Sequence, residues 1–63
     1  MSRFTTPVKI TAIKRELNFR RMVYKKRVAN GSMTKSDADF QIAVFEDILE
    51  DYNEQERKEQ LPL

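Results

Sequence analysis

Hydrophobic residues recur along this chain at helical spacing, in two segments separated by residues 30–34. In the first segment, apolar side chains return every three or four positions, which places them on one side of an α-helix. This stripe consists of Ile10, Ile13, Leu17, Tyr24 and Val28, with Arg21 near its centre. A second apolar set on another side consists of Val8, Ala12, Phe19, Met22 and Val23. One neighbouring helix covers one stripe, so the pattern predicts a helix with more than one contact surface.

The second segment carries one broad apolar stripe and an acidic opposite side. The stripe consists of Ala38, Gln41, Ile42, Phe45, Ile48, Leu49 and Tyr52. Phe40 projects away from it, toward the acidic side, and Val44 lies at its margin. An amphipathic helix of this kind buries its stripe against a neighbour and leaves its polar side in water.

Helix boundaries are marked by residues with special backbone roles. Gly31, the only glycine, suits the left-handed residue that follows a helix. Thr34 suits the N-cap of the second helix, with Asp37 three positions later in the manner of a capping box. Thr5, Thr6 and Pro7 mark the start of the first helix, as a threonine cap followed by a proline at the first helical position, and Thr11 is a second candidate cap.

The short connection between the two helices requires an antiparallel reversal. We predict one domain, with a helix over about residues 7–29, a turn at 30–34, a helix over about 35–56 and a frayed tail at 57–63. The predicted fold class is all-α, an antiparallel two-helix hairpin. Because the second stripe of the first helix stays uncovered, we expect dimerisation or docking on a partner to complete a helical bundle. A monomer with a third short helix is the alternative.

Composition narrows the chemistry of the chain. Its 63 residues include no cysteine and no histidine, which removes disulfides and the commonest ligands of zinc. A domain of this size has a small core and usually needs a stabilising partner. No apolar run approaches the length of a membrane span, and the N-terminal residues lack the pattern of a signal peptide. We therefore expect a cytoplasmic protein that does not bind membranes.

Charge is divided unevenly along the chain. Residues 1–35 contain ten Lys and Arg and one acid, a balance of +9, whereas residues 36–63 contain nine acids and two bases, a balance of −7. This asymmetry fits either phosphate binding by the first helix or neutralisation between the two helices. The candidate phosphate-binding residues are Arg20, Arg21, Lys25, Lys26 and Arg27. The acidic second helix opposes nucleic-acid binding, because it repels a phosphate backbone that lies across both helices.

An enzymatic reading finds little support in the residues. Carboxylates recur at four-residue spacing in the second helix, as at Glu46 and Glu50, but on its exposed side. A helical hairpin offers no enclosed pocket that would shift their pKa values. We therefore assign no catalytic, cofactor-binding or metal-binding residues, and expect a protein that is not an enzyme.

Part of the chain resembles a type of small helical-hairpin protein encoded by bacteriophages and prophages. The matching residues, within about 16–52, are Glu16, Leu17, Arg20 to Tyr24, Val28, Ala29, Gly31, Met33, Thr34, Ala38, Asp39, Ile42, Ala43 and Ile48. The resemblance implies a viral accessory protein that works in the host cytoplasm by clamping or inhibiting a host protein. It assigns no site residue.

The leading hypothesis is a binding protein that acts through protein–protein contact, with itself as a homodimer or with another protein. The expected contact residues are Val8, Ala12, Phe19, Met22, Val23 and Phe40. The alternative is nucleic-acid binding through the basic face of the first helix. A ligand pocket formed between subunits is a third hypothesis.

Overall fold

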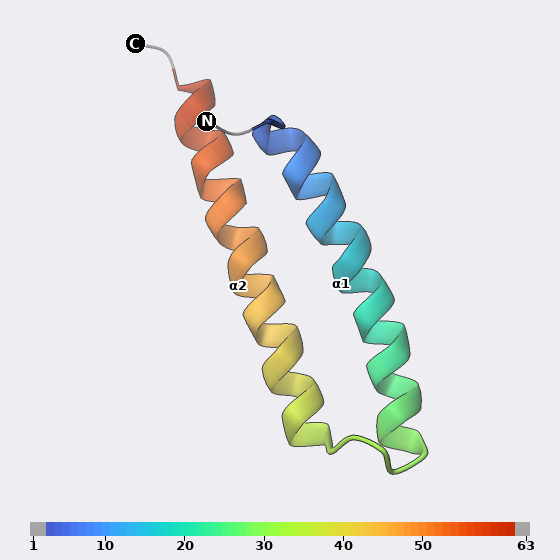
Figure 1. Ribbon diagram of the computed structural model, residues 1–63. Coiled ribbons are helices and arrows are strands. Elements are labelled where there is room, and N and C mark those ends of the chain that lie inside the picture. The colour runs from blue at the N-terminus through green and yellow to red at the C-terminus, as the bar shows by residue number, and fades with distance from the viewer. Residues whose placement is uncertain (1–2, 62–63) are drawn as a thin grey trace.

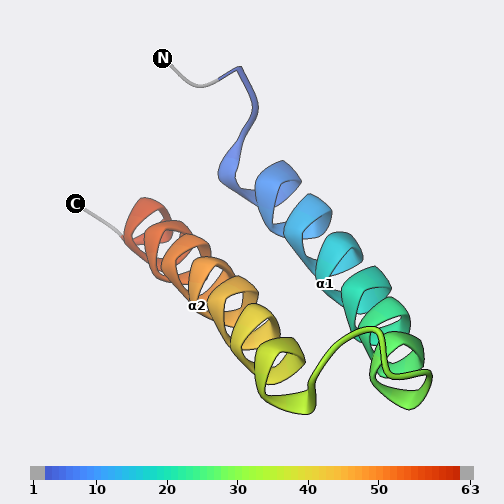
Figure 2. The same ribbon diagram turned by 60° about the horizontal axis from the view of Figure 1, so that its bottom comes forward.

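The protein is an antiparallel hairpin of two helices, α1 (Thr6–Ala29) and α2 (Lys35–Gln60). The structure, a computed structural model, describes residues 3–61. Figure 1 shows α1 and α2 side by side along their length, with the turn at one end, and the rotated view in Figure 2 shows the same arrangement. The predicted all-α hairpin is confirmed, and residues 3–5 before α1 form no helix of their own.

The turn satisfies the last carbonyl groups of α1 with backbone hydrogen bonds. The amide of Ser32 donates to the carbonyl of Arg27 at 2.9 Å, and the amide of Gly31 donates to the carbonyl of Val28 at 3.2 Å. This pair of bonds is a Schellman motif, in which the first residue after the C-cap adopts a left-handed conformation. Gly31 fills that position with φ +81°, as its place in the sequence predicted.

The two helix starts differ in how they are capped. The Thr34 hydroxyl accepts a hydrogen bond from the amide of Asp37 at 3.1 Å, so the predicted cap of α2 is confirmed. Thr5 is the residue before α1, but its side chain makes no capping hydrogen bond, contrary to the sequence-based expectation. Helix α1 begins at Thr6, one residue before Pro7.

The predicted frayed tail at 57–63 is wrong for its first four residues, because α2 continues to Gln60. The cause is a polar cluster that joins the end of α2 to the start of α1. The buried Thr6 hydroxyl donates to Glu59 Oε2 at 2.8 Å, and Gln55 Nε2 donates to the same oxygen at 3.0 Å. Helix α1 has no acid in its own first turn, so Glu59 supplies the negative charge that a helix start favours. Residues 62–63 lie outside the described part of the chain.

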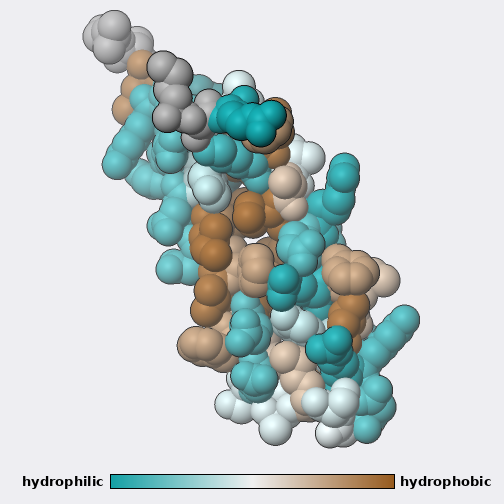
Figure 3. All heavy atoms as spheres, viewed as in Figure 1, coloured by the Kyte–Doolittle hydropathy of each residue, from teal (hydrophilic) through white to brown (hydrophobic). Residues whose placement is uncertain are grey.

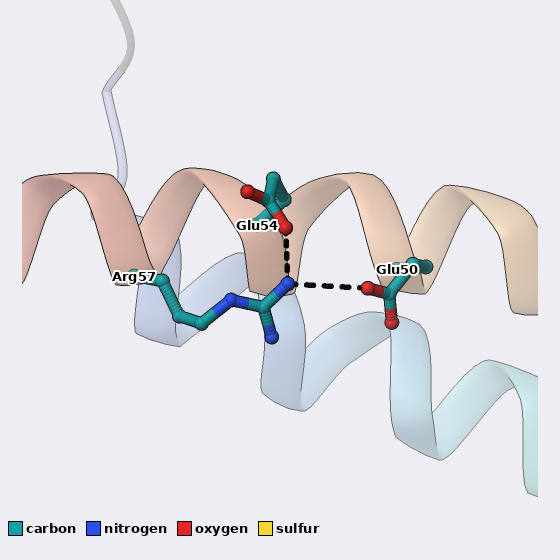
Figure 4. A network of polar contacts seen from close by, with 3 residues as sticks. All are labelled: Glu50, Glu54 and Arg57. Atoms are coloured by element: carbon teal, nitrogen blue, oxygen red, sulfur yellow. Dashed lines mark hydrogen bonds and ion pairs between the residues drawn. The ribbon is translucent and has the colours of Figure 1, made fainter.

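A second set of contacts holds the last turns of α2 from its outer side. Arg57 pairs with Glu54, one turn earlier, and with Glu50 at 3.2 Å, as Figure 4 shows. Arg57 and Lys58 also lie in the last turn, where the helix dipole favours positive charge. These contacts are local, so they extend the helix without joining it to α1.

The core between the helices is thin. Among residues 3–61, the buried apolar side chains are Ile10, Leu17, Tyr24 and Ala38. The first three belong to the predicted α1 stripe, whose other apolar members, Ile13 and Val28, are half-buried. Most of the α2 stripe is also only half-buried. A single helix-to-helix contact therefore buries one side of each helix incompletely.

The molecule is elongated and has a large surface for its mass. Its extents are 51 × 19 × 17 Å, and its radius of gyration is 14.8 Å, against about 11 Å for a compact domain of this length. The chain exposes 5328 Å², whereas a compact monomer of 7.5 kDa exposes about 4,200 Å². The two helices alone therefore leave an unusually high share of surface in water.

Leu17 is the best-buried apolar side chain among the core residues, with 2% of its surface exposed. We expect Leu17→Ala to lower the free energy of unfolding by about 2–5 kcal/mol, because it leaves a cavity in the core between the two helices. Met22→Ala, on the exposed side of α1, should change it by less than about 0.5 kcal/mol. Urea denaturation followed by circular dichroism measures both. Equal losses for the two variants would contradict the assignment of the core.

Glu59 should make stability depend on pH. Its hydrogen bond from Gln55, and then that from Thr6, lower the pKa of its carboxyl group. A lowered pKa in the folded state stabilises the fold above the unfolded value of about 4.3, and this contribution is lost as pH falls through the folded pKa. NMR titration should give Glu59 a pKa below the ordinary glutamate value in the wild type. Thr6→Val should raise that pKa, whereas Thr11→Val, which changes a hydroxyl bonded only within α1, should not.

Candidate protein-binding surfaces

The outer face of α1 is the side turned away from α2. It carries Val8, Ala12, Phe19 and Met22, all of them exposed. Phe19 and Met22 expose 59% and 62% of their surface. The spacing of these residues by three, four and seven positions keeps them on one side of the helix, opposite the buried stripe. These four residues of the predicted partner-binding set therefore lie together.

The other two predicted contact residues, Val23 and Phe40, do not lie on that face. Phe40 belongs to α2, where Val44 and Ile48 follow at intervals of four and place three apolar side chains in one row. Phe40 exposes 63% of its surface, and Val44 exposes 39%. Val23, which is half-buried, lies between the outer face and the flank of α1 that carries Arg20 and Arg27.

We name the surface that spans both helices the broad face, and define it by Val23, Phe40, Val44 and Ile48. Figure 3 shows a view in which apolar side chains gather over both helices, along the edge of α2 and on α1, with hydrophilic side chains between them. The predicted contact set thus divides into two surfaces, one on α1 alone and one shared by the two helices.

Arg20, a predicted phosphate ligand, is occupied within the hairpin. Its Nε donates to Glu16 Oε1 at 2.8 Å, and its Nη1 donates to the Tyr24 hydroxyl at 2.7 Å. Its guanidinium group lies 4.3 Å from the centre of the Phe45 ring of α2, within the range of a cation–π contact. The hydrogen bond to Tyr24, and then that to Glu16, raise the pKa of Arg20. Arg20 therefore joins α1 to α2.

Arg21 also has a partner in α2. Its Nη2 lies 2.9 Å from Glu46 Oε2, and about half of each side chain is exposed. The sequence placed Arg21 near the centre of the apolar stripe, yet the side chain reaches the edge of the helix contact and forms an ion pair there. At this position the basic and acidic helices neutralise each other, which is one of the two interpretations of the charge asymmetry.

The remaining basic candidates, Lys25, Lys26 and Arg27, are exposed near the turn. Within residues 3–61 their side chains form no ion pair. Asp39, an acid in the early part of α2, pairs with Lys35 of its own helix at 2.8 Å. Two of the five predicted phosphate ligands are thus engaged with α2 or α1, and three are available.

An open groove of ≈ 530 Å³ runs between the helices near the turn. Its lining consists of Arg21, Lys25, Val28, Lys35, Asp39, Ile42 and Glu46. Four of its five charged groups form the Arg21–Glu46 and Lys35–Asp39 ion pairs. The groove is shallow and its charges are largely neutralised, so it offers little to a small charged ligand.

The described part of the chain offers neither a metal site nor a membrane-spanning helix. Residues 3–61 contain no group of three or more acidic side chains placed to hold a metal ion. Neither described helix is long and apolar enough to cross a membrane.

Comparisons of the chain with protein-family models, with curated proteins and with solved structures find no match.

Sequence reasoning missed two features of these surfaces. It placed Val44 at the margin of the α2 stripe and Ile48 within it, so it did not identify their row with Phe40. It also missed Thr6 as a contact residue, although Thr6 continues the spacing of Ile10 and Leu17 by one further turn. Extending the buried stripe to polar residues would have found Thr6.

Arg20 should act as a structural residue rather than a phosphate ligand. We expect Arg20→Gln to lower the midpoint of urea denaturation, because it removes the contact with Phe45 and the charge opposite Glu16. Arg15→Gln, which removes a charge from the outer side of α1, should leave the midpoint unchanged. Unchanged stability of Arg20→Gln would contradict this role.

Proposed function

We propose that this protein is a non-enzymatic binding protein, and that the outer face of α1 docks on another protein. The observation that carries the proposal is the exposure of Val8, Phe19 and Met22 on one side of one helix. Large apolar side chains exposed together mark interaction surfaces more often than scattered ones do. These three side chains are exposed, so they add little to the contact between the two helices.

The energetic gain from covering this face is substantial for so small a protein. Full burial of an apolar side chain such as Phe19 or Met22 contributes about 1.5–3 kcal/mol. Several such side chains together match the whole stability of a small domain, about 5 kcal/mol at its lower limit. A partner that covers the outer face therefore stabilises the hairpin as well as binding it.

The charges beside the outer face indicate the chemistry of the partner. Arg15 and Lys26 share this side of α1, at intervals of four from Phe19 and Met22. Neither of them forms an ion pair within the described residues. An apolar helix face with basic residues fits an apolar groove with acidic side chains at its rim.

Nucleic-acid binding is the second candidate, and one observation favours it. Lys25, Lys26 and Arg27 are exposed and unpaired within residues 3–61, close to one another near the turn. Opposing it, Arg20 and Arg21 are held by contacts inside the hairpin, and α2 keeps an acidic outer side. Protein binding accounts for the exposed aromatic and aliphatic residues, which phosphate binding leaves unexplained.

The resemblance to small phage proteins suggests what kind of partner this protein binds and what the binding does. A phage accessory protein of this kind inhibits a host protein by covering a surface that the host protein needs. On that basis the partner belongs to the bacterial cytoplasm, and the hairpin acts as an inhibitor.

The outer face is tested by capture from a bacterial lysate with tagged variants. Phe19→Asp should reduce the capture of a protein partner at least tenfold, because it places a charge at the centre of the apolar contact. Ala43→Asp is the matched control, since it adds the same charge at an exposed position of α2. Mass spectrometry of the captured material, with circular dichroism of each variant, measures the outcome.

Equal capture by Phe19→Asp and the wild type would overturn the proposal. Material that nuclease removes, and that a Lys25, Lys26 and Arg27 triple alanine variant fails to capture, would establish nucleic-acid binding instead. In that case retention should also fall steeply with salt.

A further inference from the structure

We propose that a second copy of this chain covers the broad face, in a symmetric dimer in which α1 of each copy lies against α2 of the other. The broad face is distinct from the outer face of α1. Dimerisation and partner binding therefore use different residues, and either can be absent while the other holds.

The broad face has one row of side chains on each helix. On α2, Asp37 lies seven residues before Val44, and Phe40 and Ile48 flank Val44 by one turn on either side. On α1, Arg27 lies four residues after Val23 and seven after Arg20, which reaches over Phe45 on this side. Residues seven apart share one side of a helix, so each row ends near the turn in a charged residue.

The charges on these rows have opposite sign on the two helices. Arg27 ends the α1 row and Asp37 ends the α2 row, and neither forms an ion pair within the described residues of one copy. A two-fold axis along the helices places α1 of one copy on α2 of the other. An axis across the helices places α1 on α1 and α2 on α2, where like charges face. The division of charge therefore selects the first arrangement.

The contacts inside one hairpin show which residues lie level in this arrangement. Arg21 lies level with Glu46, and Thr6 with Glu59. A two-fold axis along the helices keeps these levels between copies. Val23 of one copy then lies at a level between the partner's Phe40 and the partner's Val44, so the α1 row of one copy packs against the α2 row of the other. Arg27 falls within one turn of the partner's Asp37, and symmetry makes each of these contacts twice.

The outline of the hairpin, seen face-on, is of the size that a stable dimer interface needs. Helices of 24 and 26 residues are about 36–39 Å long, and with a width of 19 Å they present about 700 Å² per copy. A standard interface takes about 800 Å² from each partner. The surface that the hairpin exposes beyond that of a compact monomer is of the same order.

The first test is the molecular mass in solution by light scattering. The wild type should give about 15 kDa, twice the mass of one chain. Val44→Asp should give the mass of one chain, whereas Met22→Asp, on the outer face, should remain a dimer. A wild-type mass of one chain, or of more than two, would overturn the proposal, as would a dimer that Val44→Asp leaves intact.

The second test uses exposed charges, so it stays informative if Val44→Asp fails to fold. Arg27→Asp and Asp37→Arg should each weaken the dimer at least tenfold. In either variant, residues 27 and 37 carry the same charge, and symmetry brings them together at two places in the dimer. An equal mixture of the two variants should restore it, since both contacts then join opposite charges. Failure of the mixture to dimerise more tightly than either variant alone would overturn the arrangement.

The two proposals fail in different ways. A monomeric wild type that still captures a partner through Phe19 removes the dimer and leaves the proposed function standing. A wild type that is a dimer but captures no partner removes the proposed function and leaves the dimer standing.

Discussion

One helix-to-helix contact holds this structure together, because the two helices of the described chain, residues 3–61, bury apolar surface only against each other. Leu17 lies near its middle, and Arg20 reinforces it by lying over Phe45. At the open end, Thr6 and Glu59 join the helices through a hydrogen bond. At the other end, the turn at residues 30–34 joins the helices through the chain itself. The contact is therefore fixed at both ends and in its middle, and its core remains thin between these points.

The sequence predicted the features that depend on neighbouring residues. Gly31 and Thr34 act through bonds within a few positions, so their roles follow from local chemistry. The end of α2 was predicted wrongly because Glu59 is stabilised by a residue 53 positions away, which no local pattern contains. Local signals at 57–60, which are charged and polar, indicate fraying when that contact is unknown.

The candidate surfaces were predicted in part for a related reason. Helical spacing gives the directions of side chains around one helix, and so it placed Val8, Phe19 and Met22 together correctly. It does not give the position of the second helix around the first. Val23 and Phe40 therefore went into the same set as the outer-face residues, although the second helix places them on the broad face. The charge cluster was divided likewise, since Arg20 lies over Phe45 of α2, whereas Lys25 forms no ion pair within the described residues.

The same constraint connects stability to association. A hairpin with a thin core gains little from its own contact, so each apolar side chain that a second protein covers adds a large fraction to the total free energy of folding. Binding to the folded state alone stabilises it by mass action. If a second protein covers Phe19 and Phe40, as we propose, natural selection can retain both residues on the surface of a marginal fold. The exposed apolar residues and the thin core are in this view two consequences of one small, two-helix architecture.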